Sequence, residues 1–406
     1  MSSVVIAGNT SGSITISAPD VSGSNTLTLP VATDTLVGKA TTDTLTNKTL
    51  VAPTITGLQT LNTPNTFGFK NRIINGGMVI DQRNAGASVT PTASGYTLDR
   101  WQLAIAQASK LSFQQNAGAV TPPVGFSNYI GLTSLSAYSI TSTDYFILTQ
   151  AVEGYNIADL AWGTASAATV TLSFQVRSSL TGTFGGVVTN GVRAYPFTYT
   201  VGSANTWTAI SITIAGDTSG TWATNNTTGL IVQFGLGVGS TRSGTAGSWA
   251  TGTYNSATGA TSVVGTSGAT FYITGVQLEK GSTATSFDFR DYGRELAMCQ
   301  RYFQVLASGT NKVIGMGWYW TATELDVTIP LITTMRAAPS LLITTGTNYY
   351  KYIRTSDLFD SLTIDGQETT DAVNLYTQTG VSGTVGLASA VSTNNALAFI
   401  GFTSEL

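Results

Sequence analysis

The abundance of threonine and glycine is the feature that most constrains how this chain can fold. Its 406 residues include 69 Thr and 44 Gly, but only 18 Lys and Arg and 21 Asp and Glu. Thr is β-branched and fits a pleated, half-buried surface, whereas Gly supplies turns between short strands. A hydrophobic fraction of 42% is still enough to build a core, so we do not expect disorder. The composition therefore predicts an all-β protein with neutral polar faces.

Hydrophobic alternation supports this prediction in three segments, 169–177, 208–214 and 230–238. In the first, every second residue is apolar, which places these side chains on one face of a strand: Val170, Leu172, Phe174 and Val176. Turn signals such as Asn190-Gly191 separate the segments. Several short strands at this spacing are typical of a sandwich or jelly roll.

Residue types that are rare or missing exclude several functions. The chain has no His and a single Cys, Cys299. This excludes a Ser-His-Asp triad, a His-ligated metal, an intrachain disulfide and a Cys-built zinc site. A net charge of −3 argues against nucleic acid as the main partner. No phosphate-binding loop motif occurs, and we expect no cofactor.

The chain shows no signal peptide and no apolar run long enough to cross a membrane. We therefore expect a soluble protein made in a cytoplasm, without membrane insertion.

Composition divides the chain into residues 1–66, 67–290 and 291–406. The first segment contains no aromatic residue and repeats Thr-Asp-Thr-Leu at 33–36 and 42–45. Such a segment buries little surface alone. We expect its strands to become stable by pairing with copies of the segment or with a partner; the alternative is a flexible linker. The second segment has the composition of a β-sandwich core, and the third reads as one helix followed by a small β-domain.

The predicted helix runs near 292–306, with Asp291 as a plausible N-cap. Its apolar residues repeat at heptad a/d spacing, which favours packing between copies of the chain. The alternative is a single amphipathic helix lying on the sandwich. The a/d residues are Tyr292, Leu296, Cys299, Phe303 and Leu306.

Aromatic residues are the candidates for carbohydrate binding, because their faces stack on the apolar side of a sugar ring. Two clusters lie in the last segment, Trp318-Tyr319-Trp320 and Tyr349-Tyr350-Lys351-Tyr352. In a strand, Trp318 and Trp320 would share a face, and one face of each strand would belong to the core. The candidate sugar contacts are Trp318, Trp320, Tyr349, Tyr350, Tyr352 and Trp249.

Catalysis is not expected. Glycoside hydrolysis usually needs two carboxyl groups across the scissile bond, and none of the candidate acids lies in a recognisable motif. Those acids are Asp99, Asp144, Glu153, Asp159, Glu324 and Asp326. Repeated coils of a β-helix are also absent from the sequence.

Three stretches in series resemble phage tail fibre proteins. The first stretch resembles the virion-attaching part of such fibres, and it comprises SGSITISAP (11–19), NTLTLP (25–30) and the residues up to TITG. The second stretch resembles a jelly-roll module related to carbohydrate-binding modules, and it comprises KNRIINGGMVIDQRNAGA (70–87), YTLDRW (96–101) and FYITGVQLEKG (271–281). RELAMCQRYFQ (294–304) and IPLITTMRAAP (329–339) resemble a distal domain.

The resemblance implies a homotrimeric fibre in the virion, synthesised in the host cytoplasm. Residues 1–66 would bind other tail or baseplate proteins, 67–290 would form the jelly roll, and 291–406 would form the distal module. The a/d residues of the predicted helix would be the trimer contacts. The partner of the fibre would be a host surface polysaccharide or lipopolysaccharide. The alternatives are a capsid-decorating or neck fibre without a receptor role, and a polysaccharide depolymerase tailspike.

The sequence also departs from the family. Related modules carry a calcium-binding Asp in the last strand where this chain has Thr274, so we expect no metal. Gln175 stands where the phage family usually has an aromatic residue, which removes one potential stacking platform.

Overall fold

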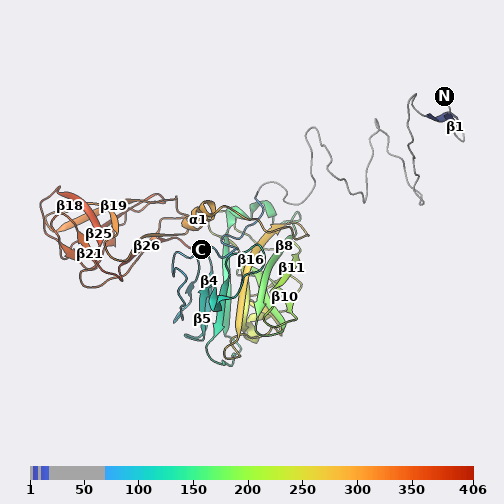
Figure 1. Ribbon diagram of the computed structural model, residues 1–406, viewed down its shortest axis with the longest axis horizontal. Coiled ribbons are helices and arrows are strands. Elements are labelled where there is room, and N and C mark those ends of the chain that lie inside the picture. The colour runs from blue at the N-terminus through green and yellow to red at the C-terminus, as the bar shows by residue number, and fades with distance from the viewer. Residues whose placement is uncertain (1–2, 8–10, 18–68) are drawn as a thin grey trace. The chain divides into compact units, whose positions relative to one another are not determined.

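The structure, a computed structural model, describes residues 3–7, 11–17 and 69–406 (Figure 1). The chain divides into two units, Met1–Thr60 and Leu61–Leu406. In the first unit, β1 (Ser3–Ala7) pairs antiparallel with β2 (Ser13–Ser17). Part of the SGSITISAP stretch (11–19) thus forms a strand. The remaining predictions for 1–66 lie outside the described residues.

The second unit contains a sandwich of two antiparallel sheets, which confirms the all-β prediction (Figure 1). The larger sheet has the order β14 (Ala250–Thr251), β10 (Arg193–Val201), β9 (Gly182–Thr189), β12 (Thr228–Val238), β7 (Tyr145–Glu153), β4 (Gln102–Ile105) and β3 (Gly95–Tyr96). The smaller sheet has the order β11 (Thr208–Ile214), β8 (Val170–Ser178), β16 (Thr270–Lys280), β6 (Ile130–Ser134) and β5 (Leu111–Gln115).

Short elements complete the sandwich. β13 (Ser243–Gly244) and β15 (Ser256–Ala257) form a parallel pair. Four single turns of 3₁₀-helix lie in the connections, at Ala117–Ala119, Gly154–Asn156, Ala158–Leu160 and Ser240–Arg242.

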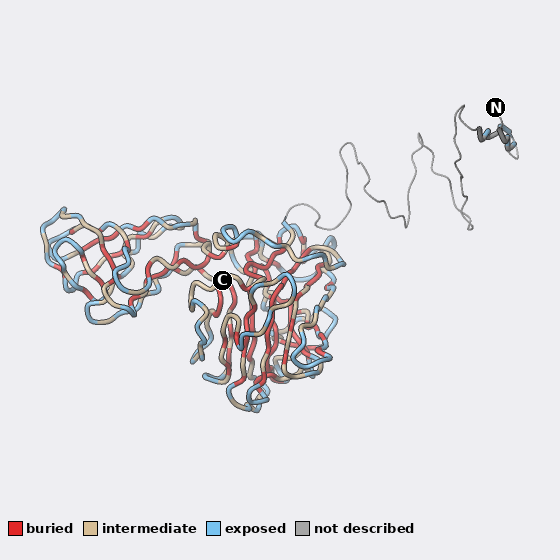
Figure 2. The backbone as a smooth tube through the Cα atoms, viewed as in Figure 1, coloured by how far each residue is buried: buried red, intermediate tan, exposed pale blue. Residues whose placement is uncertain are grey.

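The sandwich core lies between the two sheets, where Figure 2 shows buried residues running along the strands. The alternation predicted for 169–177 is confirmed in β8: Val170, Leu172 and Phe174 are buried, whereas Ser173 and Gln175 are half-buried. β12 likewise buries Leu230, Val232, Phe234 and Leu236. Period-2 alternation identified these strands because each sheet faces the core on one side.

The only α-helix of the described ranges, α1, spans Tyr292–Gln300. Asp291 caps it as predicted, since its carboxylate accepts a hydrogen bond of 2.9 Å from the backbone N–H of Arg294. The prediction that the helix continues to 306 is wrong, because β17 (Phe303–Ser308) begins three residues after its end. Within the described ranges, no helix has the length and apolarity needed to span a bilayer.

The predicted helical seam is therefore wrong beyond the end of α1. Phe303 and Leu306 lie on a strand, and Cys299 and Phe303 are buried within their own chain. Cys299 packs with Ile74, Ile80 and Tyr302, so the helix covers the start of the sandwich module. Three of the five proposed trimer contacts thus have other neighbours or another secondary structure. Tyr292 remains exposed and Leu296 half-buried, and a trimer contact at either residue stays a prediction.

Two further sheets form the distal module. The smaller has the order β17, β26 (Phe399–Thr403) and β20 (Ser340–Ile343). The larger has the order β22 (Leu358–Phe359), β21 (Tyr350–Tyr352), β25 (Ala388–Thr393), β18 (Val313–Thr321), β19 (Glu324–Pro330), β24 (Ala372–Thr377) and β23 (Thr363–Ile364). Every pairing in both sheets is antiparallel.

The distal module begins and ends at one strand pair. β17 pairs with β26, so that Ser308 lies opposite Phe399. After β26 the chain returns to the sandwich, where Glu405 forms ion pairs with Arg83, at 2.9 Å, and with Arg100. The carboxylate of Glu405 is 6% exposed, so both pairs are shielded from water. These contacts fasten the C-terminal segment to the sandwich.

Candidate glycan-binding groove

The outer face of the larger distal sheet carries an aromatic row flanked by polar side chains. In the strand register, Trp318 of β18 lies opposite Asp326 of β19, which lies opposite Tyr376 of β24. These residues line a groove of about 650 Å³, which is within the size range of small-ligand sites. The groove is lined by Trp318, Trp320, Glu324, Asp326, Thr328, Asp365, Gln367, Ala372, Val373, Asn374, Tyr376 and Gln378.

Strand alternation explains why these side chains meet. Trp318 and Trp320 are two residues apart in β18 and point to the same face, whereas Tyr319 between them is fully buried. The same period in β19 places Glu324, Asp326 and Thr328 on the groove side and buries Leu325 and Val327 in the distal core. Trp320 is 63% exposed and offers its ring to a ligand.

Hydrogen bonds hold the polar floor of the groove in place. The Asn374 amide donates to the Asp365 carboxylate at 2.7 Å, and its oxygen accepts from the Thr328 hydroxyl at 2.8 Å. Burial raises the pKa of Asp326, and the nearby charges of Glu324 and Asp365 raise it further, against a hydrogen bond from Asn374. The floor is thus a fixed set of amide, hydroxyl and carboxylate groups beside two indole rings.

The structure brings together two of the predicted sugar contacts, Trp318 and Trp320. The prediction is wrong for Tyr350 and Tyr352, which are fully buried. The Tyr350 hydroxyl donates to the backbone oxygens of Thr344 and Phe399, and that of Tyr352 donates to the oxygen of Leu387. Both rings pack in the distal core, so neither has a free face for a sugar.

Tyr349 and Trp249 lie away from the groove. Tyr349 is half-buried against the distal core. Trp249 is half-buried in the sandwich, where its indole N–H donates to the Ala215 oxygen at 2.7 Å and its ring meets the edges of Trp162 and Trp222. A sugar contact at either residue stays a prediction.

Sequence reasoning missed most of the polar side of the groove. Tyr376, Asn374, Asp365, Gln367 and Gln378 come from β24 and the segments beside it, about 50 residues after Trp320. Glu324 and Asp326 were identified as acids but were not connected with the Trp pair. The alternation of AVNLYT (372–377) was the available signal, since it places Asn374 and Tyr376 on one face.

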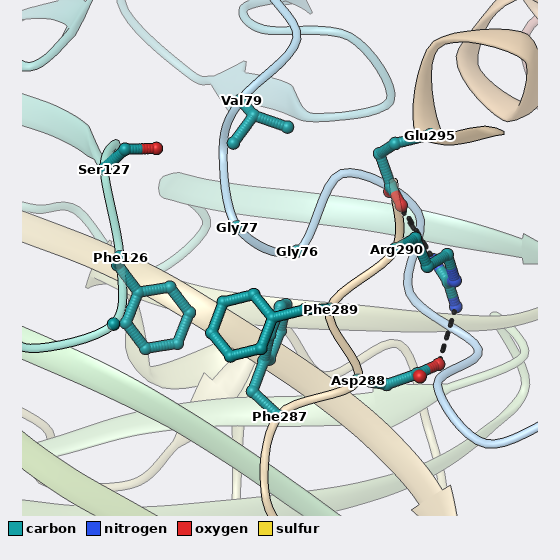
Figure 3. A pocket seen from close by; sticks show the side chains of 11 residues that line it. Gly76, Gly77, Val79, Phe126, Ser127, Phe287, Asp288, Phe289, Arg290 and Glu295 are labelled. Carbon is teal, nitrogen blue, oxygen red and sulfur yellow. Dashed lines mark hydrogen bonds and ion pairs between the residues drawn. The ribbon is translucent and has the colours of Figure 1, made fainter. Parts of the chain in front are cut away.

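A second hollow, of about 390 Å³, lies beside the start of α1 (Figure 3). Its wall is the triad of Phe126, Phe287 and Phe289, whose ring centroids lie 4.9–5.4 Å apart. The charged groups at its edge pair with one another: Arg290 lies 3.2 Å from Glu295 and 3.7 Å from Asp288. This hollow is apolar and offers fewer free polar groups to sugar hydroxyls than the distal groove.

The position related to a calcium ligand has a different environment here. The Thr274 side chain is fully buried, and its hydroxyl donates to the Asn128 oxygen at 2.7 Å. Within the described ranges, no three His, Cys, Asp or Glu residues are arranged to hold a metal ion.

Comparisons with known proteins give low similarity. No family model matches the chain, and no curated protein matches it. Among solved structures, the enzymatically active domain of bacteriophage CBA120 tailspike protein 4 has a TM-score of 0.30 at 11% identity, and the match covers 52% of this chain and 21% of that one.

Two carbohydrate-binding modules are similar at the same level. TmCBM61, solved with β-1,4-galactotriose, has a TM-score of 0.27 at 10% identity over 52% of this chain and 99% of that one. A family 11 module from Clostridium thermocellum, solved with a mixed-linked tetrasaccharide, has a TM-score of 0.26 at 12% identity over 46% and 93%. These scores are too low to support an inference about function, which therefore rests on the residues of this chain.

Proposed function

We propose that this chain is a structural subunit of a phage tail fibre that attaches the virion to a glycan on the host cell surface. The observation that carries the proposal is the distal groove, in which exposed indole rings lie beside fixed amides and carboxylates. Aromatic faces bind the apolar side of a sugar ring, and such polar groups bind its hydroxyls. The ordered resemblance of the sequence to tail fibres supports the virion location.

Removing one indole ring tests the sugar contact. We expect Trp320→Ala in the full chain to weaken binding to a glycan array by about five- to thirtyfold, the equivalent of about 1–2 kcal/mol of lost ring contact. Tyr155→Ala is the matched control, because Tyr155 is an equally exposed aromatic residue of the sandwich. Equal binding by Trp320→Ala and the control would place the sugar site elsewhere.

The fibre is proposed to be a homotrimer that attaches through residues 1–66 to other tail or baseplate proteins. Three copies multiply a weak sugar contact through a high effective concentration. Analytical ultracentrifugation of the full chain should give a trimer, and electron microscopy of virions should place it on a projecting tail fibre. A capsid-decorating or neck fibre would share the trimer, but its soluble chain would not compete with virus for adsorption to cells.

Polysaccharide cleavage is a second candidate function, because the groove holds Glu324, Asp326 and Asp365 side by side. Glycosidases use paired carboxyl groups, one of them with a raised pKa, and the pKa of Asp326 is raised by burial. Incubation of the full chain with host capsule or lipopolysaccharide distinguishes the two functions. Adhesion predicts bound but intact polysaccharide, whereas cleavage predicts released reducing ends that are lost in Asp326→Asn.

A further inference from the structure

The charge of the distal groove has a single sign. Its lining includes Glu324, Asp326 and Asp365 but no Lys or Arg. In the part of the chain that the structure describes, none of these three carboxylates takes part in an ion pair. The neutral amide of Asn374 donates to Asp365 and Asp326, and the backbone N–H of Gln367 also donates to Asp365. A ligand in the groove therefore meets negative charge that no side chain of the lining offsets.

We infer that the distal groove binds sugars that are neutral or carry a free amine, and rejects sugars that carry a carboxylate, sulfate or phosphate. This inference rests on the proposed glycan-binding function of the same groove. Like charges within a few ångströms repel strongly where water is partly excluded. Discrimination by charge thus adds to the fit of the sugar rings on the indoles.

Asp326 lies in the floor of the groove among the other two carboxylates. The residue is 9% exposed, so solvent screens its charge less than that of a surface carboxylate whenever the group is ionised. The titratable groups that face it are Glu324 on its own strand, Asp365 at the end of β23 and the Tyr376 phenol on β24. From β18, the residue opposite it is the uncharged Trp318.

Neutral and amine-bearing sugars fit the same groups well. A sugar hydroxyl donates to a carboxylate oxygen in a charge-assisted hydrogen bond, and an ammonium group adds an ion pair. The exposed amides of Gln367 and Gln378 add both donors and acceptors at the rim.

An array of matched glycans tests the inference on the full chain. It carries neutral glucose, galactose and mannose oligosaccharides, the same oligosaccharides oxidised at C6 to uronates, and chitosan oligomers. At pH 7.5 and low salt we expect binding to a neutral or chitosan oligosaccharide, and at least tenfold weaker binding to the oxidised form. The difference should shrink in 0.5 M NaCl, because salt screens charge.

Variants separate repulsion from a steric effect. Glu324→Gln and Asp365→Asn should each reduce the penalty for the uronate, while Asp360→Asn, an exposed carboxylate outside the groove, should not. Equal or tighter binding of the uronates, or a penalty that neither salt nor the groove variants change, would overturn the inference and leave glycan binding intact. No binding to any of the three classes would overturn the proposed function and the inference together.

Discussion

Replacing Glu153 by Gln should destabilise the contact between the sandwich and the residues that follow α1. Glu153 ends β7 and is 2% exposed. Its carboxylate accepts hydrogen bonds of 2.7 and 3.1 Å from the Arg301 guanidinium and one of 2.6 Å from the Tyr302 hydroxyl. Gln keeps the shape and one acceptor oxygen, but its NH₂ group faces a guanidinium that also donates.

The magnitude follows from the burial of the pair. Breaking a fully buried ion pair costs about 3–5 kcal/mol, because the remaining charge loses its partner. The Arg301 side chain is 33% exposed and regains some hydration, so we expect a loss of about 2–3 kcal/mol in the free energy of unfolding. Urea unfolding of the full chain, followed by circular dichroism, measures this loss.

The pH dependence gives an independent check on the same pair. Burial alone would raise the pKa of Glu153, but hydrogen bonds from Arg301 and Tyr302 outweigh it and hold the pKa below its ordinary value of 4.5. The stabilisation is therefore present above the ordinary pKa and is lost as the pH falls through the lowered one. The matched control is Glu324→Gln, which removes a half-buried carboxylate without an ion-pair partner in the described ranges. If Glu153→Gln unfolds at the same urea concentration as this control, the ion pair contributes nothing and our reasoning fails.

Three further predictions concern buried groups. Burial raises the pKa of the Cys299 thiol well above its ordinary value, so Ellman's reagent should label the native chain slowly and the urea-unfolded chain at once; rapid native labelling would contradict the packing of α1. Burial raises the pKa of Asp99 from 3.8 to about 6, so ionisation of Asp99 opposes folding. The free energy of unfolding should therefore fall by about 3 kcal/mol as the pH rises from about 4 to 7. Asp99→Asn should flatten the stability profile over that range, and an unchanged profile would show that Asp99 does not cause this pH dependence. A methyl group at Gly186 would overlap the backbone oxygen of Gln233 and the Phe197 ring, so Gly186→Ala should lower the free energy of unfolding by about 1–3 kcal/mol, measured by thermal unfolding. Gly191 has open space around it, so Gly191→Ala is a control that tests only the cost of placing Ala in a left-handed conformation.

The two aromatic clusters show what the sequence could and could not predict about the site. In Tyr350-Lys351-Tyr352, the Lys between the two rings indicates that its own face meets water and that the rings point inward, as they do. In Trp318-Tyr319-Trp320 all three side chains are aromatic, so alternation predicts that the Trp residues share a face but not which face is buried. The choice depends on β19 and β25, which pair with β18 on either side.

The predicted helix was longer than α1 for a related reason. In FQVLAS (303–308), Phe303 and Leu306 continue the heptad spacing of α1, but the same residues also suit a strand. Pairing with β26 decides between the two, and β26 lies almost a hundred residues later. Local periodicity thus predicted the strands of the sandwich well, because their partners all impose the same period. It failed for residues 303–308, where pairing with a strand distant in the sequence decides between helix and strand.

The pairing of β17 with β26 at the base of the distal module has a consequence for how such a protein can diversify. Because Ser308 and Phe399 lie opposite each other, residues 309–398 form an excursion whose two ends are neighbours. Within it, Arg336 donates to the backbone oxygens of Asn226 and Glu405, and β20 pairs with β26, so a replacement must keep this stretch as well as the two ends. Insertions or exchanges on either side of this stretch would therefore vary the larger distal sheet and leave the Glu405 ion pairs and the sandwich in place.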